Sequence, residues 1–223
     1  MTAGPIYTDL AVLIPAAGSG NRLGLGPKAL LQLNEAPLVQ WVARKALSVA
    51  TEVVIACRPQ DLATVSELCP GCRCVPGGDS RQQTVQQLFA ASQAPWLLLH
   101  DVARPFVTAT LLRQVFAAAQ ASGAAAALLD PEVPVGLIAE GLITRHFPRE
   151  QIGIFQSPQV FSRQAMQAAL AYARQNGLQT QSTLQLVLAT GAIVQSVPGE
   201  KANIKITTPE DWLMAQCLTR YLT

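Results

Sequence analysis

The chain has 223 residues, of which 50% are hydrophobic and 13% charged, and its formal net charge is +2. This length and composition predict a chain that folds around one sizeable core, and they exclude a disordered chain. With 16 basic and 14 acidic residues and no basic run, the charge indicates neither a nucleic-acid surface nor a membrane surface. The apolar stretches are too short to span a bilayer, and residues 1–10 lack the basic start of a signal peptide, so we expect a cytoplasmic protein.

Short apolar runs alternate with stretches of helical spacing along most of the chain. Strands that are apolar throughout, with helices between them, are typical of a parallel sheet covered by helices on both faces. The expected strands are 10–16, 52–57, 72–75, 96–100, 124–129 and 193–197. The expected helices are 39–49, 63–69, 81–93, 108–122, 163–176, 184–190 and 209–221. The sequence therefore predicts an α/β fold, which we expect to form one domain over residues 1–223.

The segment 131–148 does not follow this alternation of strands and helices. Residues 131–148 contain Pro131, Pro134 and Pro148, have mixed polarity and show no helical period. We interpret the segment as an arm that projects from the sheet. In open parallel sheets ligands bind at the carboxyl ends of the strands, which directs attention to the loops after Ala16, Val75, His100 and Leu129.

The loop after the first expected strand has the composition of an anion-binding loop. Gly18 and Gly20 permit positive φ and a close approach of the backbone, and their small neighbours leave N–H groups free to face an anion. Arg22 and Lys28 add two cations. Together these features suit a triphosphate.

Two other interpretations of this loop stay open. Gly18, Gly20 and Gly24 could begin a dinucleotide-binding fold, or the loop could be an ordinary tight turn. Pro27 disfavours the first, because a crossover helix should already be running there. The second expected strand, 52–57, is also followed by Arg58, with no acid for a ribose diol.

The loop 77–81 follows the third expected strand. Its glycines permit contact with a base or ribose, and Thr84 offers a hydroxyl on the first helical turn. Ser80 is equally suited to cap the helix that follows, and the two roles are compatible.

The most apolar expected strand, 96–100, is followed by the charged residues Asp101 and Arg104. Asp101 could hold Mg²⁺, which prefers carboxylate and phosphate oxygens, and Arg104 could clamp a phosphate through two hydrogen bonds. The alternative is an Asp–Arg pair without a ligand. His100 fits a satisfied strand-end histidine better than a catalyst.

Lys205 lies between two isoleucines in what we expect to be a short strand, and it would point into a cleft. The alternative is a lysine at a sheet edge. Thr208 and Pro209 suit the cap and first position of the last helix.

The five cysteines, an odd number, argue against a disulfide framework. Cys69, Cys72 and Cys74 have metal-like spacing, but a structural zinc site takes four ligands and neither histidine is near in sequence, so we favour ordinary thiols.

Six segments in the same order resemble the 2-C-methyl-D-erythritol 4-phosphate cytidylyltransferases of isoprenoid synthesis, and are similar to the related ribitol-5-phosphate cytidylyltransferases. These segments are 14–22, 27–28, 77–81, 100–105, 156–161 and 203–211. The resemblance implies a Rossmann-like nucleotidyltransferase fold and a homodimer joined through an arm at about 131–157. It also implies CTP and a polyol phosphate as substrates, with Mg²⁺ near Asp101.

The resemblance implies site residues as well. Arg22, Lys28 and Lys205 match the family's catalytic cations, and Arg149 matches an arm arginine that holds the sugar phosphate. Asp101 and Arg104 would also face the acceptor. The expected nucleotide-binding residues are Pro15, Ala16, Ala17, Gly18, Ser19, Gly20, Gly77, Gly78, Asp79, Arg81, Thr84 and Val102.

The chain departs from the family pattern mainly in the acceptor half. Asp130-Pro131 stands where the family has Asp-Thr, the arm is several residues short, and residues 180–183 lack the usual acids. Val102 replaces an alanine, and the spacing from Arg22 to Lys28 is one residue short. Three hypotheses follow: an enzyme acting on methylerythritol phosphate, the same chemistry on another polyol phosphate such as ribitol 5-phosphate, and a binding module without catalysis.

Overall fold

The computed structural model describes residues 4–20, 22–180 and 182–222. Across these residues the main sheet has seven strands in the order β11-β7-β10-β6-β1-β4-β5. All neighbouring strands pair in parallel except β10, which runs antiparallel to β6 and β7. The strands are β1 (Tyr7–Ala16), β4 (Ala50–Cys57), β5 (Arg73–Pro76), β6 (Trp96–Leu99), β7 (Ala124–Leu129), β10 (Ile154–Ser162) and β11 (Gln195–Pro198).

Helices cover both faces of this sheet. They are α1 (Leu38–Leu47), α2 (Leu62–Leu68), α3 (Arg81–Ala91), α4 (Ala109–Ser122), α5 (Arg163–Gln175), α6 (Thr183–Ala189) and α7 (Pro209–Leu222). Successive side chains of β1 point to opposite faces, so Val12 and Ile14 pack with α1, α2 and α4, while Leu13 packs with α3, α5 and α6. The strands are buried on both faces, which explains their continuous apolar sequence.

The expected α/β fold is confirmed. Every expected helix is present with its ends shifted by at most two residues, and every expected strand is present within a few residues. The sequence interpretation missed β10. Pro158 lies in the middle of that strand, and a proline argues against a central strand because it cannot donate to the ladder. The structure accommodates it with a register shift against β7 between Phe155 and Gln159.

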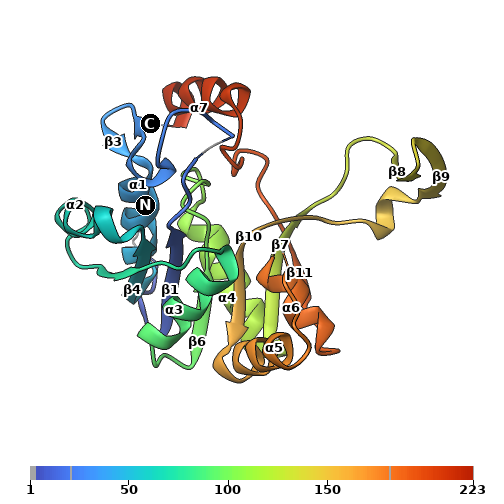
Figure 1. The fold of residues 1–223 in the computed structure, drawn as a ribbon, viewed down its shortest axis with the longest axis horizontal. Helices are drawn as coiled ribbons and strands as arrows, with labels where there is room; N and C mark the ends of the chain where they lie inside the picture. The colour runs from blue at the N-terminus through green and yellow to red at the C-terminus, as the bar shows by residue number, and fades with distance from the viewer. Residues whose placement is uncertain (1–3, 21, 181, 223) are drawn as a thin grey trace.

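The arm is a β-hairpin. Between β7 and β10 the chain forms β8 (Val135–Ala139) and β9 (Leu142–Phe147), which pair only with each other in the described part of the chain. Figure 1 shows this hairpin far to one side of the sheet, at the end of two extended connections. Its apolar side chains are exposed: Leu137, Ile138, Leu142 and Ile143.

A second small hairpin follows the first loop. The 3₁₀ turn Lys28–Leu30 leads into β2 (Gln32–Leu33) and β3 (Ala36–Pro37), and α1 begins only at Leu38. No helix therefore follows the glycines directly, and the dinucleotide-binding interpretation is wrong. The hairpin packs on α7 through a third apolar cluster that includes Leu33, Phe106 and Ile206, which places the segment 203–208 beside the first loop.

The expected strand around Lys205 is wrong. Residues 203–207 form an irregular segment in which Ile206 N–H donates to the Ala103 carbonyl. Thr208 does cap α7, since its hydroxyl accepts from Asp211 N–H and the Asp211 carboxylate accepts from Thr208 N–H. Within the described residues, none of the helices has the length and apolar character needed to cross a bilayer.

Candidate active site

The main cavity lies at the carboxyl ends of β1, β4, β5 and β6, where the topology predicted a ligand. Its volume is about 630 Å³. It is lined by Pro15, Ala17, Gly18, Ser19, Gly20, Arg22, Lys28, Arg58, Pro59, Gln60, Gly77, Gly78, Asp79, Ser80, Arg81, Thr84, Asp101, Val102, Ala103 and Lys205. Most of the expected nucleotide-binding residues are on this list. Ala16 is an exception, because its side chain is buried in the core beneath the loop.

The first loop requires glycine at residue 20. Gly20 has a φ of +76°, and a Cβ built there would overlap the Gly26 carbonyl oxygen. The Gly20 carbonyl accepts from the N–H groups of Leu23 and Gly24, so the chain turns back sharply at this point. The turn carries Arg22 and Lys28 back over the cavity. Asn21, part of the expected loop, lies outside the described residues.

The loop 77–81 is held in place by the Thr84 hydroxyl and by a capping box at the start of α3. Ser80 caps α3, as the sequence predicted, and its side chain and that of Gln83 each accept from the other's backbone N–H. The buried Thr84 hydroxyl donates to the Ser80 carbonyl and accepts from Gly78 N–H. Thr84 therefore shapes the loop that forms one wall of the main cavity.

Asp101 lies between two cations. Its carboxylate is 2.8 Å from Arg81 Nη1 and 2.9 Å from Lys205 Nζ. Burial alone would raise the pKa of this carboxyl, but the charges of Arg81 and Lys205 hold the pKa far below its ordinary value. Asp101 is therefore ionised at neutral pH. The expected alternative, a pair with Arg104, is wrong.

Lys28 completes the cationic side of the main cavity. Its Nζ donates to the Ile206 carbonyl at 2.9 Å. Burial lowers the pKa of Lys28, and the nearby charges of Arg22 and Lys205 lower it further. Mutual repulsion of this kind requires that the three cations share one space. The structure thus brings Arg22, Lys28 and Lys205 together at one cavity. From the sequence, their common location was only an expectation.

Arg104 does not face the main cavity. Its guanidinium is buried, and its Nη1 donates to the Asn203 carbonyl at 2.6 Å. The expected phosphate clamp is therefore corrected: Arg104 fastens the segment that carries Lys205 to the loop after β6.

Arg149 is also absent from the main cavity of its own chain. It lies at the base of the arm, largely exposed and paired with Glu150 at 3.2 Å. There it lines a second cavity of about 910 Å³, together with Asp130, Glu132 and Lys201. Arg149 therefore belongs to a different part of the surface from the three cations.

The sequence interpretation missed one wall of the main cavity. Arg58, Pro59 and Gln60 follow β4, and the guanidinium of Arg58 is held by Asp61 at 2.6 Å. The rule that ligands bind at the carboxyl ends of strands applied to this loop too. Of the segment 180–183, Thr180, Ser182 and Thr183 line a separate small cavity together with Arg81 and Gln82, and Gln181 lies outside the described residues.

A helix-covered parallel sheet with a glycine-rich loop and converging cations at its carboxyl edge defines a protein of the nucleotidyltransferase class. Residues 10–221 match the family model of 2-C-methyl-D-erythritol 4-phosphate cytidylyltransferase. The chain belongs to this family.

Individual relatives agree with this assignment. A 2-C-methyl-D-erythritol 4-phosphate cytidylyltransferase of Thermus thermophilus is 42% identical over 214 residues, which cover 95% of this chain and 98% of the relative. One from Deinococcus radiodurans is 36% identical over 215 residues, which cover 95% and 90%. A crystal structure of the enzyme from Thermus thermophilus superposes with a TM-score of 0.80 at 37% identity, covering 94% of this chain and 98% of that one.

The geometry of the first loop makes a prediction about stability. Gly20→Ala should lower the free energy of unfolding by about 2–5 kcal/mol, because the left-handed φ and the overlap with Gly26 both add cost. Gly24→Ala is the matched control: its φ is +74°, but a Cβ there meets nothing within 4 Å. It should cost only about 1–2 kcal/mol. Urea unfolding of the two variants measures the difference, and equal losses would contradict the close approach.

Proposed function

We propose that this protein transfers CMP from CTP to 2-C-methyl-D-erythritol 4-phosphate and releases pyrophosphate. The observation that carries the proposal is the convergence of Arg22, Lys28 and Lys205 on one cavity, beside a glycine-rich loop. Family membership supports the same reaction, since the relatives named above carry it in their names. The family's place in isoprenoid synthesis comes with the resemblance.

The reaction needs charge stabilisation more than it needs proton transfer. A phosphate oxygen of the polyol phosphate attacks the α-phosphorus of CTP, a new P–O bond forms, and the bond to the β-phosphate breaks. The leaving pyrophosphate takes the bonding electron pair. Because a phosphate dianion is already a nucleophile, no general base or covalent intermediate is required, and catalysis is positioning plus electrostatics.

Each residue of the main cavity has a role in that scheme. The backbone of residues 17–20 would cradle the triphosphate, and the loop 77–80 would contact the cytidine. Arg22, Lys28 and Lys205 would neutralise the charge that develops on the α-phosphate and on the leaving group. Asp101 orients Lys205 through the 2.9 Å ion pair.

The residues present fit Mg²⁺ that is bound jointly with the nucleotide. The described residues contain no cluster of three or more acidic, histidine or cysteine side chains suited to a metal ion. Asp101 Oδ1 is buried, and its contact with Arg81 is an ion pair without hydrogen-bond geometry, which leaves lone pairs for a hard cation. Magnesium is commonly held by one or two carboxylates plus substrate phosphates. We therefore propose that Asp101 holds the ion with the triphosphate, and that the ion would supply further neutralisation of phosphate charge.

The arm supports a homodimer in which each arm serves the partner's cavity. The hairpin exposes Ile138, Leu142 and Ile143, which are 68%, 68% and 80% exposed, and such a patch marks an interaction surface. Arg149 lies in the arm region and not in its own main cavity. We propose that in a two-fold dimer Arg149 contacts the acceptor phosphate in the other subunit's cavity. We also propose a cytoplasmic location, since all five cysteines are free thiols.

The direct test of the proposed function is a substrate panel. The full-length protein is incubated with Mg²⁺, each of the four nucleoside triphosphates and a set of polyol phosphates, and pyrophosphate release is measured. We expect release with CTP and 2-C-methyl-D-erythritol 4-phosphate. Turnover only with ribitol 5-phosphate would replace the acceptor, and CTP binding in calorimetry without any turnover would support a binding module instead.

Removing one cation of the main cavity should slow chemistry strongly. Lys28→Ala is expected to lower kcat by about two to three decades, because one preorganised charge contact contributes about 3–4 kcal/mol to transition-state stabilisation. The matched control is Lys45→Ala, which removes an exposed lysine of α1 outside the main cavity. A near-normal rate for purified Lys28→Ala would count against the assignment.

Mixed dimers test whether Arg149 acts across the interface. Lys28→Ala and Arg149→Ala each disable one half of a site. If the arm serves the partner, a mixed dimer contains one site with both native residues, so random 1:1 mixing should restore about a quarter of wild-type activity. If Arg149 acts in its own chain, no intact site forms and mixing restores nothing.

A further inference from the structure

The turn after β4 forms a wall of the main cavity that the proposed chemistry does not use. Arg58, Pro59 and Gln60 line this wall, and of the three only Arg58 carries a charge. Its side chain is 27% exposed, so it can contact a ligand. The place of Arg58 and its hydrogen bonds indicate which part of a bound nucleotide it meets.

Arg58 lies beside the loop 77–81. Gly77 N–H donates to the Cys57 carbonyl at 2.7 Å, so Arg58 and Gly77 leave the sheet side by side. A Cβ built on Gly77 would lie only 2.5 Å from the Ala17 side chain, which shows that the first loop reaches the same corner. Arg58 therefore stands at the part of the main cavity where this loop would contact the cytidine.

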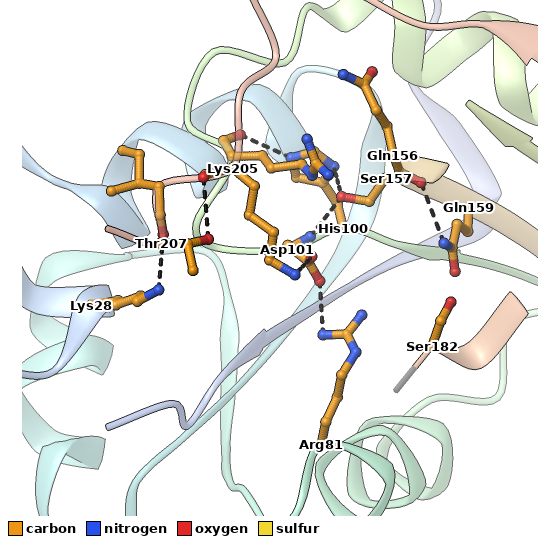
Figure 2. A network of polar contacts seen from close by, with 12 residues as sticks. Lys28, Arg81, His100, Asp101, Gln156, Ser157, Gln159, Ser182, Lys205 and Thr207 are labelled. Carbon is orange, nitrogen blue, oxygen red and sulfur yellow. Dashed lines mark hydrogen bonds and ion pairs between the residues drawn. The ribbon is translucent and has the colours of Figure 1, made fainter. Parts of the chain in front are cut away.

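The three cations that would face the phosphates form a separate group. Figure 2 shows Lys205 pointing to Asp101, with Lys28 at the left of the view. Burial lowers the pKa of Lys28 most, and the charges of Arg22 and Lys205 lower it further, whereas Arg58 has no part in this shift. Arg58 is thus not a member of the charge cluster that suits a triphosphate.

The guanidinium of Arg58 is fixed in direction by Asp61. Arg58 Nε donates to Asp61 Oδ2 at 2.6 Å, and Nη2 donates to Oδ1 at 2.9 Å. Asp61 N–H also donates to the Arg58 carbonyl at 2.9 Å, so backbone and side chain both close the turn. Asp61 is 7% exposed and directly precedes α2, yet its carboxylate does not cap that helix. The carboxylate is committed to Arg58 instead.

A guanidinium held in this way suits a neutral acceptor better than a phosphate. The carboxylate of Asp61 balances its charge, which weakens its attraction for an anion. Asp61 occupies one edge of the guanidinium, and the outer edge keeps two parallel N–H groups, one on Nη1 and one on Nη2. No described residue accepts a hydrogen bond from that edge. Two parallel donors fit two adjacent acceptors on a base, as when arginine binds guanine in DNA.

Cytosine and uracil, which have the same size, differ in this respect. Cytosine presents O2 and N3 as adjacent acceptors, whereas N3 of uracil carries a proton and would face an N–H donor. We propose that Arg58 recognises the base of CTP by donating from its outer edge to cytosine O2 and N3, with Asp61 as its positioning residue. This inference rests on the proposed function, and it assigns the choice of base to a residue of this chain.

Nucleotide binding in the absence of an acceptor tests the assignment. Calorimetry with Mg²⁺ gives the Kd of CTP, of UTP and of tripolyphosphate, which has no base. In Arg58→Gln we expect the Kd of CTP to rise about 10- to 100-fold, the cost of hydrogen bonds from a charged group. The Kd values of UTP and tripolyphosphate should hardly change. Equal losses for CTP and UTP, or weaker binding of tripolyphosphate, would indicate a sugar or phosphate contact and overturn the proposal.

The matched control is Arg44→Gln, which removes an exposed arginine of α1 outside the main cavity and should leave all three Kd values unchanged. Arg58→Lys keeps the charge at residue 58 but not the fork of donors. It should lose selectivity for CTP over UTP as fully as Arg58→Gln does. Wild-type selectivity in Arg58→Lys would contradict recognition by two parallel N–H groups.

Asp61→Asn tests the positioning role while Arg58 stays in place. Selectivity for CTP over UTP should fall, because the guanidinium is no longer held in one direction. Tripolyphosphate should bind as tightly as before or more tightly, because the charge of Arg58 is no longer balanced. A parallel loss of selectivity and of tripolyphosphate binding would indicate general damage to the cavity and would count against the proposal.

Steady-state kinetics give an independent measurement. A contact with the base is the same in the ground state and the transition state, so Arg58→Gln should raise KM for CTP and leave kcat nearly unchanged. A lower kcat with an unchanged KM would assign Arg58 to the reacting phosphates and sink the proposal. Selective binding of CTP by a wild-type chain that releases no pyrophosphate would instead refute the proposed function alone, so the two failures are distinguishable.

Discussion

The cations of the main cavity can gather at one sheet edge because a buried carboxylate, that of Asp101, lies between two of them. Arg81 and Lys205 come from segments more than a hundred residues apart in the chain, and each lies within 3 Å of a different oxygen of this group. Within the described chain Lys28 has no such carboxylate partner: burial lowers its pKa most, and the charges of Arg22 and Lys205 lower it further. A cavity with this charge favours a polyanion, because a triphosphate would remove repulsion that the protein alone does not neutralise. The same charges that cost stability in the protein alone thus provide affinity and transition-state stabilisation.

The sheet determines where this charge cluster can form. Parallel strands end at one edge, so short loops after β1, β5 and β6 meet there without any long-range signal in the sequence. This is why the α/β fold and three walls of the main cavity could be predicted: apolar strands, glycines and strand-end charges are local features. The cap at Ser80 was equally predictable, since the serine and Gln83 stand three residues apart.

The parts that could not be predicted depend on partners distant in sequence. Strand β10 was hidden because Pro158 contradicts local strand propensity, while pairing with strands on both sides outweighs that cost. In the local sequence Arg104 resembles an arginine that binds phosphate, because it follows the end of a strand. Only the fold shows that its guanidinium donates to the Asn203 carbonyl. Lys205 was expected in a strand because isoleucines flank it, yet Ile206 packs in the cluster under α7, and the described chain offers this segment no strand neighbour.

Strand β10 connects the arm to the main cavity. Among the described strands of the main sheet it alone runs antiparallel to its neighbours, so it enters from the arm and passes the carboxyl edge before it reaches the core. A parallel strand would reach that edge only at its end, followed by a loop. Because β10 runs the other way, Gln156 and Ser157 lie at the edge while still held by the ladder, where their polar groups can fix Asp101 and Asn203 rigidly. The reversed strand therefore links the arm, through a few residues, to the backbone that carries the reactive charges.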